Sequence, residues 1–123
     1  MARRAIYVVG GCGVEDVLAG LSGLDGVERK VFVEGVGWVL ARVEVWGVGE
    51  CRVVRVGLKG EKGGRFWGEF FEVCVKERGG EVIVSVRRVG GVGRVSADLL
   101  GGWLLEVLGE ACRSLSVYNV RVS

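Results

Sequence analysis

The stretch Ser96–Leu115, SADLLGGWLLEVLGEACRSL, is the only long segment of the chain with a clear helical period. At 3.6 residues per turn, its apolar side chains fall on one broad stripe. Ser96 suits an N-cap, and Asp98 in the first turn suits the positive end of the helix dipole. The pattern predicts an amphipathic helix of about 30 Å that covers one face of a sheet. The stripe consists of Ala97, Leu100, Leu104, Val107, Leu108, Ala111 and Leu115.

The composition predicts one domain, 1–123, made mostly of strands. The chain has 123 residues, of which 50% are hydrophobic, and valine is abundant. This length suits a single core, and the valine bias favours β-strands. Scarce amides and a charged fraction of 26% are typical of a heat-adapted protein, whereas the absence of proline argues against that interpretation.

Charge and cysteine usage restrict the partners that we expect. The net charge is only +2, and the two local basic clusters are Arg3–Arg4 and Arg87–Arg88. Because basic residues are spread along the chain, we expect solvated arginines and no nucleic-acid partner. The four cysteines are far apart and the chain has no histidine, so we expect no metal and no cofactor. No apolar run is long enough for a signal core or a membrane span, which predicts a cytoplasmic protein.

The chain begins with a strand, a glycine turn and a short helix. Ala5–Val9 is apolar, and Val14–Leu21 has a helical period. The turn Gly11–Gly13 lacks the third glycine of a dinucleotide fingerprint, because Asp16 stands at that position. We therefore expect a plain turn. Ser22–Lys30 is expected to be a turn region, with room for a second short helical turn.

From Val31 onward the pattern has a period of two, which predicts antiparallel strands. In the stretch 38–46, one face of the predicted strand carries Val39, Ala41, Val43 and Val45, and the other carries Trp38, Leu40, Arg42, Glu44 and Trp46. In the next strand, Val54, Val56 and Leu58 share a face. A turn at 78–80 predicts a hairpin in which Val75 lies opposite Val82 and Lys76 opposite Glu81.

The strand around Phe70 contains a conflict between two faces. Pairing with Val54 and Val56 favours Phe66, Gly68 and Phe70 on the inner face, while the next hairpin favours Phe71, Val73 and Val75. A bulge at Phe70–Phe71 would satisfy both. It would also bring Arg52 opposite Val73 and Cys51 opposite Cys74. The alternative keeps Trp67, Glu69 and Phe71 inside and buries a carboxylate.

The order of elements resembles that of the START-like, or SRPBCC, helix-grip superfamily. The resemblance rests on Ala5–Val9, Val14–Leu21, the run of strands and Ser96–Leu115, and on no short motif. It implies an α+β fold in which a curved antiparallel sheet wraps one long C-terminal helix, and a space between them that holds apolar molecules. The tail, 117–122, is a strand or a helix extension. A terminal strand would instead favour a ferredoxin-like α+β sandwich.

The inner face is the candidate ligand site. Gly101 and Gly102 thin the helix beside Trp103, and Gly68 leaves a gap in its strand, which favours a cavity over a solid core. Arg88 and Arg52 share the inward parity and can sit at its mouth. The predicted lining is Val39, Ala41, Val43, Val54, Val56, Phe66, Phe70, Phe71, Val73, Val84, Val86, Arg88, Leu100, Trp103, Leu104 and Val107.

Three functional hypotheses follow. The first is a non-enzymatic carrier of a small hydrophobic ligand. The second is a dimeric interaction module with a solid core, joined through the outer strip Trp38, Leu40 and Trp46, unless the tail covers that strip. The third is a cyclase-like or hydrolase-like enzyme that uses a buried carboxylate such as Glu69. Since the chain has no histidine, we assign no catalytic residue.

Overall fold

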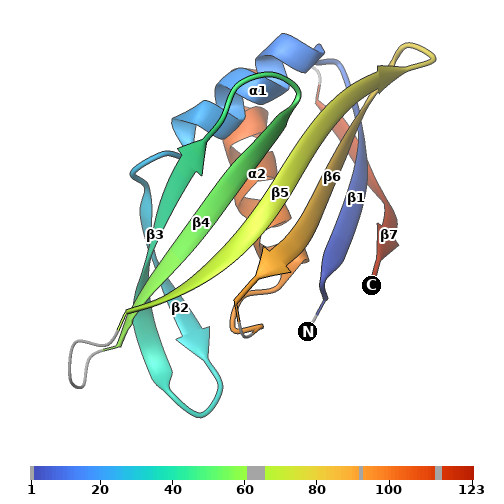
Figure 1. Cartoon of the computed structure of the whole chain (residues 1–123). Coiled ribbons are helices and arrows are strands. Elements are labelled where there is room, and N and C mark those ends of the chain that lie inside the picture. The colour runs from blue at the N-terminus through green and yellow to red at the C-terminus, as the bar shows by residue number, and fades with distance from the viewer. Residues whose placement is uncertain (1, 61–65, 92, 113–114) are drawn as a thin grey trace.

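The computed structural model describes residues 2–60, 66–91, 93–112 and 115–123. It is an α+β fold with one seven-stranded antiparallel sheet in the order β2-β3-β4-β5-β6-β1-β7. The sheet is curled, and both helices lie on one of its faces (Figure 1). The strands are β1 (Arg4–Gly10), β2 (Glu28–Val33), β3 (Gly37–Trp46), β4 (Cys51–Gly60), β5 (Phe66–Arg78), β6 (Glu81–Gly90) and β7 (Ser116–Val122), and the helices are α1 (Val14–Gly23) and α2 (Ala97–Ala111).

Helix α2 begins where its capping chemistry predicts. The Ser96 hydroxyl accepts a hydrogen bond from Leu99 N at 3.3 Å, which satisfies one of the free donors of the first turn. Its buried side includes Leu100, Leu104 and Leu108, as the stripe predicts. The helix ends at Ala111 instead of Leu115, and Ala111 is exposed.

The tail is a strand, and its position corrects the idea that it covers the outer strip. Strand β7 pairs antiparallel with β1 at one edge of the sheet, while β2 and β3 lie at the other edge. Five consecutive strands separate the two helices, which is not the β-α-β-β-α-β order of a ferredoxin-like sandwich. The short helical turn allowed for Ser22–Lys30 does not form, because α1 continues to Gly23 and β2 begins at Glu28.

The predicted register of the β5–β6 hairpin is wrong by two residues. Val75 lies opposite Val84, and Glu81 lies opposite Arg78 instead of Lys76. The cause is a two-residue turn in which Gly79 and Gly80 both have positive φ, 61° and 82°. A shift of two residues keeps every side chain on its predicted face.

The predicted bulge in the pairing of β5 with β4 is absent, and the register shift at Phe70–Phe71 lies in the pairing with β6, so the faces of β5 are not reversed. The register shifts between Phe70 and Phe71 in the pairing with β6, where Val89 is the extra residue, while β4 and β5 keep one register throughout. Phe71 and Glu69 are therefore buried, and Phe70 is 37% exposed on the outer face. The prediction that Phe70 points inward is wrong. The side chains of Phe66 and Trp67 lie outside the described residues.

Two disulfides connect distant parts of the chain. Cys51 lies opposite Cys74 and Arg52 opposite Val73, as predicted, although β4 and β5 reach this register without a bulge between them. The two cysteines are bonded across β4 and β5. A second bond, Cys12–Cys112, joins the turn after β1 to the end of α2. Sequence reasoning found no partner for Cys12, and the even number of cysteines was its only signal.

Candidate functional site

The inner face gathers most of the predicted lining into one hydrophobic cluster between the sheet and the helices. Val107 is partly buried, Arg88 is half-buried at the strand end, and Phe70 is on the opposite face. The lining residues in the cluster are Val39, Ala41, Val43, Val54, Val56, Phe71, Val73, Val84, Val86, Leu100, Trp103 and Leu104.

These side chains are sealed from solvent. The predicted lining residues on the sheet that belong to the cluster are no more than 2% exposed, and Trp103 is 6% exposed. A void wide enough for a water molecule would expose the side chains that line it. A ligand between these residues would therefore require the sheet and helix to part.

The glycines that were expected to leave space for a cavity do not do so on the inner face. The ring of Tyr7 fills the space beside Gly101, so a Cβ at that position would lie within 3 Å of the ring. Gly68 faces Gly57 across β4 and β5, and the guanidinium of Arg55 lies over both glycines on the outer face. Gly102 contacts nothing on its side-chain side.

Tyr7 brings a polar hydroxyl into the layer between the sheet and α2. Its hydroxyl donates to the main-chain oxygen of Asp98 at 3.4 Å, which ties β1 to the first turn of α2. Burial raises the pKa of Tyr7 above its usual value, and the negative charge of Asp98 adds to this effect.

Glu69 is fully buried on the inner face of β5, as the alternative to the bulge predicted. Its carboxylate accepts hydrogen bonds from Gly93 N at 3.1 Å and from Arg94 N at 2.8 Å. These bonds satisfy main-chain donors in the connection between β6 and α2. Glu69 therefore holds this connection in place, and its role as a catalytic base stays a prediction.

Neither α1 nor α2, the helices among the described residues, lies on the outer face of the sheet (Figure 1). At the β2–β3 edge, large apolar side chains alternate with charges. Phe32 and Trp38 are direct cross-strand partners with ring centroids 5.6 Å apart in an edge-to-face arrangement. They are 59% and 58% exposed, Trp46 is 46% exposed and Leu40 is 39% exposed. We call Phe32, Trp38, Leu40 and Trp46 the outer strip; sequence reasoning had missed Phe32.

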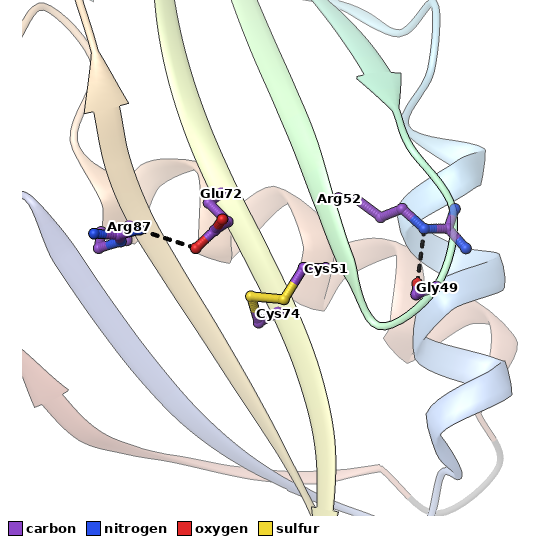
Figure 2. The surroundings of a disulfide bond; sticks show 6 residues. All are labelled: Gly49, Cys51, Arg52, Glu72, Cys74 and Arg87. Carbon is purple, nitrogen blue, oxygen red and sulfur yellow. Dashed lines mark hydrogen bonds and ion pairs between the residues drawn. A yellow bond between two sulfur atoms is a disulfide. The ribbon is translucent and has the colours of Figure 1, made fainter.

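Two charged pairs also lie on this face. Arg55 contacts Glu44 at 3.5 Å, and Arg87 contacts Glu72 at 3.0 Å. Figure 2 shows the second pair beside the Cys51–Cys74 bond. It also shows Arg52, expected at a cavity mouth, whose Nε donates to Gly49 O at 2.9 Å in the β3–β4 turn.

The folded sheet also brings the two arginine pairs of the sequence together. Arg4 and Arg87 are direct cross-strand partners, and Arg88 N donates to Arg3 O at 2.8 Å. These four arginines and Ser123 line a surface hollow of about 350 Å³ at the end of β1 and β6. Sequence reasoning could not join pairs that are more than 80 residues apart without the register of the two strands.

Comparisons with known proteins give no relatives. No family model matches the chain, and neither a curated protein nor a solved structure matches it significantly. Across the part of the chain that the structure describes, no three metal-ligating side chains form a cluster. Within the same residues, neither helix has the length and hydropathy that crossing a membrane requires.

Proposed function

We propose that the protein is a non-enzymatic α+β interaction module that pairs with a second copy of itself through the outer strip. The observation that carries the proposal is the contrast between a sealed inner face and an uncovered corner where Phe32 and Trp38 are more than half exposed. Large aromatic side chains are enriched in protein interfaces, and contiguous exposed apolar patches mark contact sites.

The charges around the outer strip suit a second copy. A two-fold interface brings the same patch of both subunits together, so the patch must complement itself. Both signs are present: Glu28 lies opposite Arg42, and Glu44 lies opposite Arg55. A rotated copy can therefore place a basic side chain of one subunit against an acidic side chain of the other.

Light scattering on two matched variants tests the dimer. Trp46→Arg introduces a charge into the strip, whereas Val122→Arg introduces the same charge at the opposite edge. Trp46 and Val122 are equally exposed, 46% each. We expect a dimeric mass for wild type and Val122→Arg, and a monomeric mass for Trp46→Arg. A monomeric wild type, or equal dissociation of both variants, would contradict the proposal.

A second candidate is the carrier of a small apolar ligand, which rests on a helix-grip interpretation of the fold. It is supported by the position of α2 against the concave face of the curled sheet (Figure 1). It is also supported by the Arg29–Glu106 ion pair, 3.2 Å long, which bridges the edge strand β2 and α2. Opening this bridge would give access to the valine-rich inner face.

Binding of a hydrophobic dye to wild type and Glu106→Gln tests the carrier. A carrier whose entrance is closed by the ion pair should bind the dye faster when the pair is broken. Glu110→Gln removes the same charge elsewhere on α2 and is the control. Absence of saturable dye or fatty-acid binding in all three proteins would exclude this candidate.

We further propose that the protein works in the cytoplasm of a heat-adapted cell. Two disulfides are typical of oxidising compartments, but intracellular proteins of hyperthermophiles share this feature. Counting alkylated thiols by mass spectrometry, immediately after lysis under acid quench, tests the bonds. Four free thiols would contradict them.

A further inference from the structure

We propose that the Cys51–Cys74 disulfide is a thiol–disulfide exchange site and that the hollow beside Cys74 admits a small acidic thiol such as glutathione. The bond joins β4 and β5 on the outer face, where Cys51 is exposed and Cys74 is half-buried (Figure 2). Exposed disulfides are the ones that small thiols can reach and reduce. This activity goes beyond the proposed dimer and does not depend on it.

The second disulfide has the opposite surroundings. Cys112 is only 9% exposed and belongs to the hydrophobic core, and Cys12 is packed against that core. An attacking thiol must reach one of the two sulfur atoms, so the rate of exchange depends on access. The structure therefore assigns exchange to Cys51–Cys74 and a structural role to Cys12–Cys112.

The hollow lies on the outer face of β5 and β6 and has a volume of about 380 Å³. Cys74 and Lys76 lie on the same face of β5, and Ser85 and Ile83 are their direct partners on β6. Alternate residues of a strand share a face, and so do direct cross-strand partners, so these four side chains lie together. The full lining is Cys74, Lys76, Glu77, Arg78, Ile83 and Ser85.

The hollow is on the side of Cys74 that faces away from Cys51. Cys51 lies opposite Cys74, and Cys74 lies opposite Ser85, so the three residues form one row across β4, β5 and β6. A thiolate attacks one sulfur of a disulfide and displaces the other. An approach from the hollow reaches Sγ of Cys74 with Sγ of Cys51 behind it as the leaving atom. Because Cys51 is exposed, water can solvate the thiolate that leaves.

The charges around the hollow favour a thiol that carries carboxylates. Lys76 and Arg78 contribute two positive charges to the lining, against one negative charge from Glu77. All three side chains are exposed. Positive charge at a site raises the local concentration of an acidic ligand and speeds its arrival. Glutathione fits this requirement, because it combines one thiol with two carboxylates.

The exchange takes place in two steps that use two molecules of glutathione. The thiolate of the first molecule bonds to Sγ of Cys74, and Cys51 leaves as a thiolate that takes a proton from solvent. The thiolate of the second molecule attacks the glutathione sulfur of this mixed disulfide. Cys74 then leaves as a thiolate and is protonated in turn. Two electrons pass from glutathione to the protein, which gives two cysteine thiols and one glutathione disulfide.

The main chain keeps the two thiols adjacent after the bond has opened. Strands β4 and β5 pair in one register along their whole length. Beside the bond, Val75 N also donates to Glu50 O at 2.8 Å. These hydrogen bonds do not depend on the disulfide, so we expect the reduced protein to stay folded. Glutathione disulfide should therefore restore the same bond.

Timed reduction of the oxidised protein by glutathione tests the site. Samples taken without denaturant are quenched with acid, alkylated and mapped by peptide mass spectrometry. We expect Cys51 and Cys74 to become labelled at least about tenfold faster than Cys12 and Cys112, because access controls the reaction. The mixed disulfide that forms during the reaction should be on Cys74. The reduced protein should melt cooperatively, at a lower temperature than the oxidised protein.

Two matched variants test the role of the hollow. Lys76→Glu reverses a charge in its lining, and Lys30→Glu makes the same change on the outer face of β2, where Lys30 is also exposed. At low ionic strength, Lys76→Glu should slow reduction by glutathione roughly three- to tenfold, and Lys30→Glu should leave the rate unchanged. Mercaptoethanol, which has no carboxylate, should show a smaller effect of Lys76→Glu.

Four results would overturn the proposal. Equal reduction rates for the two disulfides would show that access does not select between them. A rate that rises with urea in parallel with the unfolded fraction would show that exchange requires global unfolding. A mixed disulfide on Cys51 alone, or equal slowing by the two lysine variants, would show that the thiol does not enter through the hollow. Light scattering of the same samples reports the dimer separately, so failure of the exchange site and failure of the dimer are distinguishable.

Discussion

The two faces of the sheet are built from the same alternating strands but differ in what covers them. On the inner face, Val54, Val56 and Phe71 are fully buried under the two helices. On the outer face, the neighbouring positions Val53 and Phe70 are 40% and 37% exposed. Hydrophobic residues at adjacent positions therefore differ: the inner ones are part of the core that stabilises the fold, and the outer ones remain accessible to solvent.

The largest expected losses of stability come from removing either of the two disulfides. Cys12–Cys112 closes a loop with a sequence separation of 100, on the helix side, while Cys51–Cys74 has a separation of 23 on the outer face. Loop-closure entropy gives about 4.7 kcal/mol for the first bond and about 3.4 kcal/mol for the second. Urea unfolding of Cys12→Ser/Cys112→Ser and Cys51→Ser/Cys74→Ser measures both. A larger loss from the second pair would contradict this order.

Alanine substitutions at Phe70 and Phe71 compare how much the outer and inner faces contribute to stability at adjacent positions. Phe71→Ala removes a fully buried ring and should lower the free energy of unfolding by about 3–5 kcal/mol. Phe70→Ala removes a partly exposed ring and should lower it by less than about 1 kcal/mol. Chemical denaturation of both variants is the measurement. Equal losses would show that the assignment of faces in β5 is wrong.

Alanine substitutions at Gly101 and Gly102 compare a packed position of α2 with an open one. Gly101→Ala places a methyl group against the Tyr7 ring and should destabilise the fold by about 1–3 kcal/mol. Gly102→Ala meets nothing within 4 Å and should stabilise the helix by about 0.5–1 kcal/mol. Thermal melts of the two variants should therefore shift in opposite directions. Stabilisation by both would mean that there is free space beside Gly101.

The smallest effect is a pH dependence that arises from Tyr7. Its pKa is raised by burial, so the unfolded chain loses the phenolic proton first as the pH increases. The free energy of unfolding should be unaffected below about pH 10, the usual pKa of tyrosine, and should fall above it. Tyr7→Phe should reduce this alkaline loss. An identical alkaline profile for the variant would contradict the assignment.

Periodicity predicted most of the fold. The helical stripe of Ser96–Leu115 and the alternation of Val39 to Val45 identified the main helix and its sheet, because each pattern has one period over many residues. The faces of β5 were not predictable in the same way, since FWGEFFEV has apolar residues at both parities. Burial of Glu69 depends on main-chain donors of a distant loop, and no local pattern contains that information.

The candidate sites were less predictable than the fold. Trp38, Leu40 and Trp46 were expected on the outer face, but Phe32 joins them through the β2–β3 register. The arginines were expected to be dispersed because they are dispersed in the sequence, and pairing of β1 with β6 gathers four of them. The cavity argument failed to include Tyr7, whose ring comes from the other end of the chain.

Native mass spectrometry of freshly purified protein tests the difference between the two faces most directly. If the outer face binds a second copy and the inner face is sealed, the spectrum will contain a species of twice the 13.2 kDa chain mass with no small-molecule adduct. A monomer that carries a lipophilic adduct would contradict this account and would assign the function to the inner face.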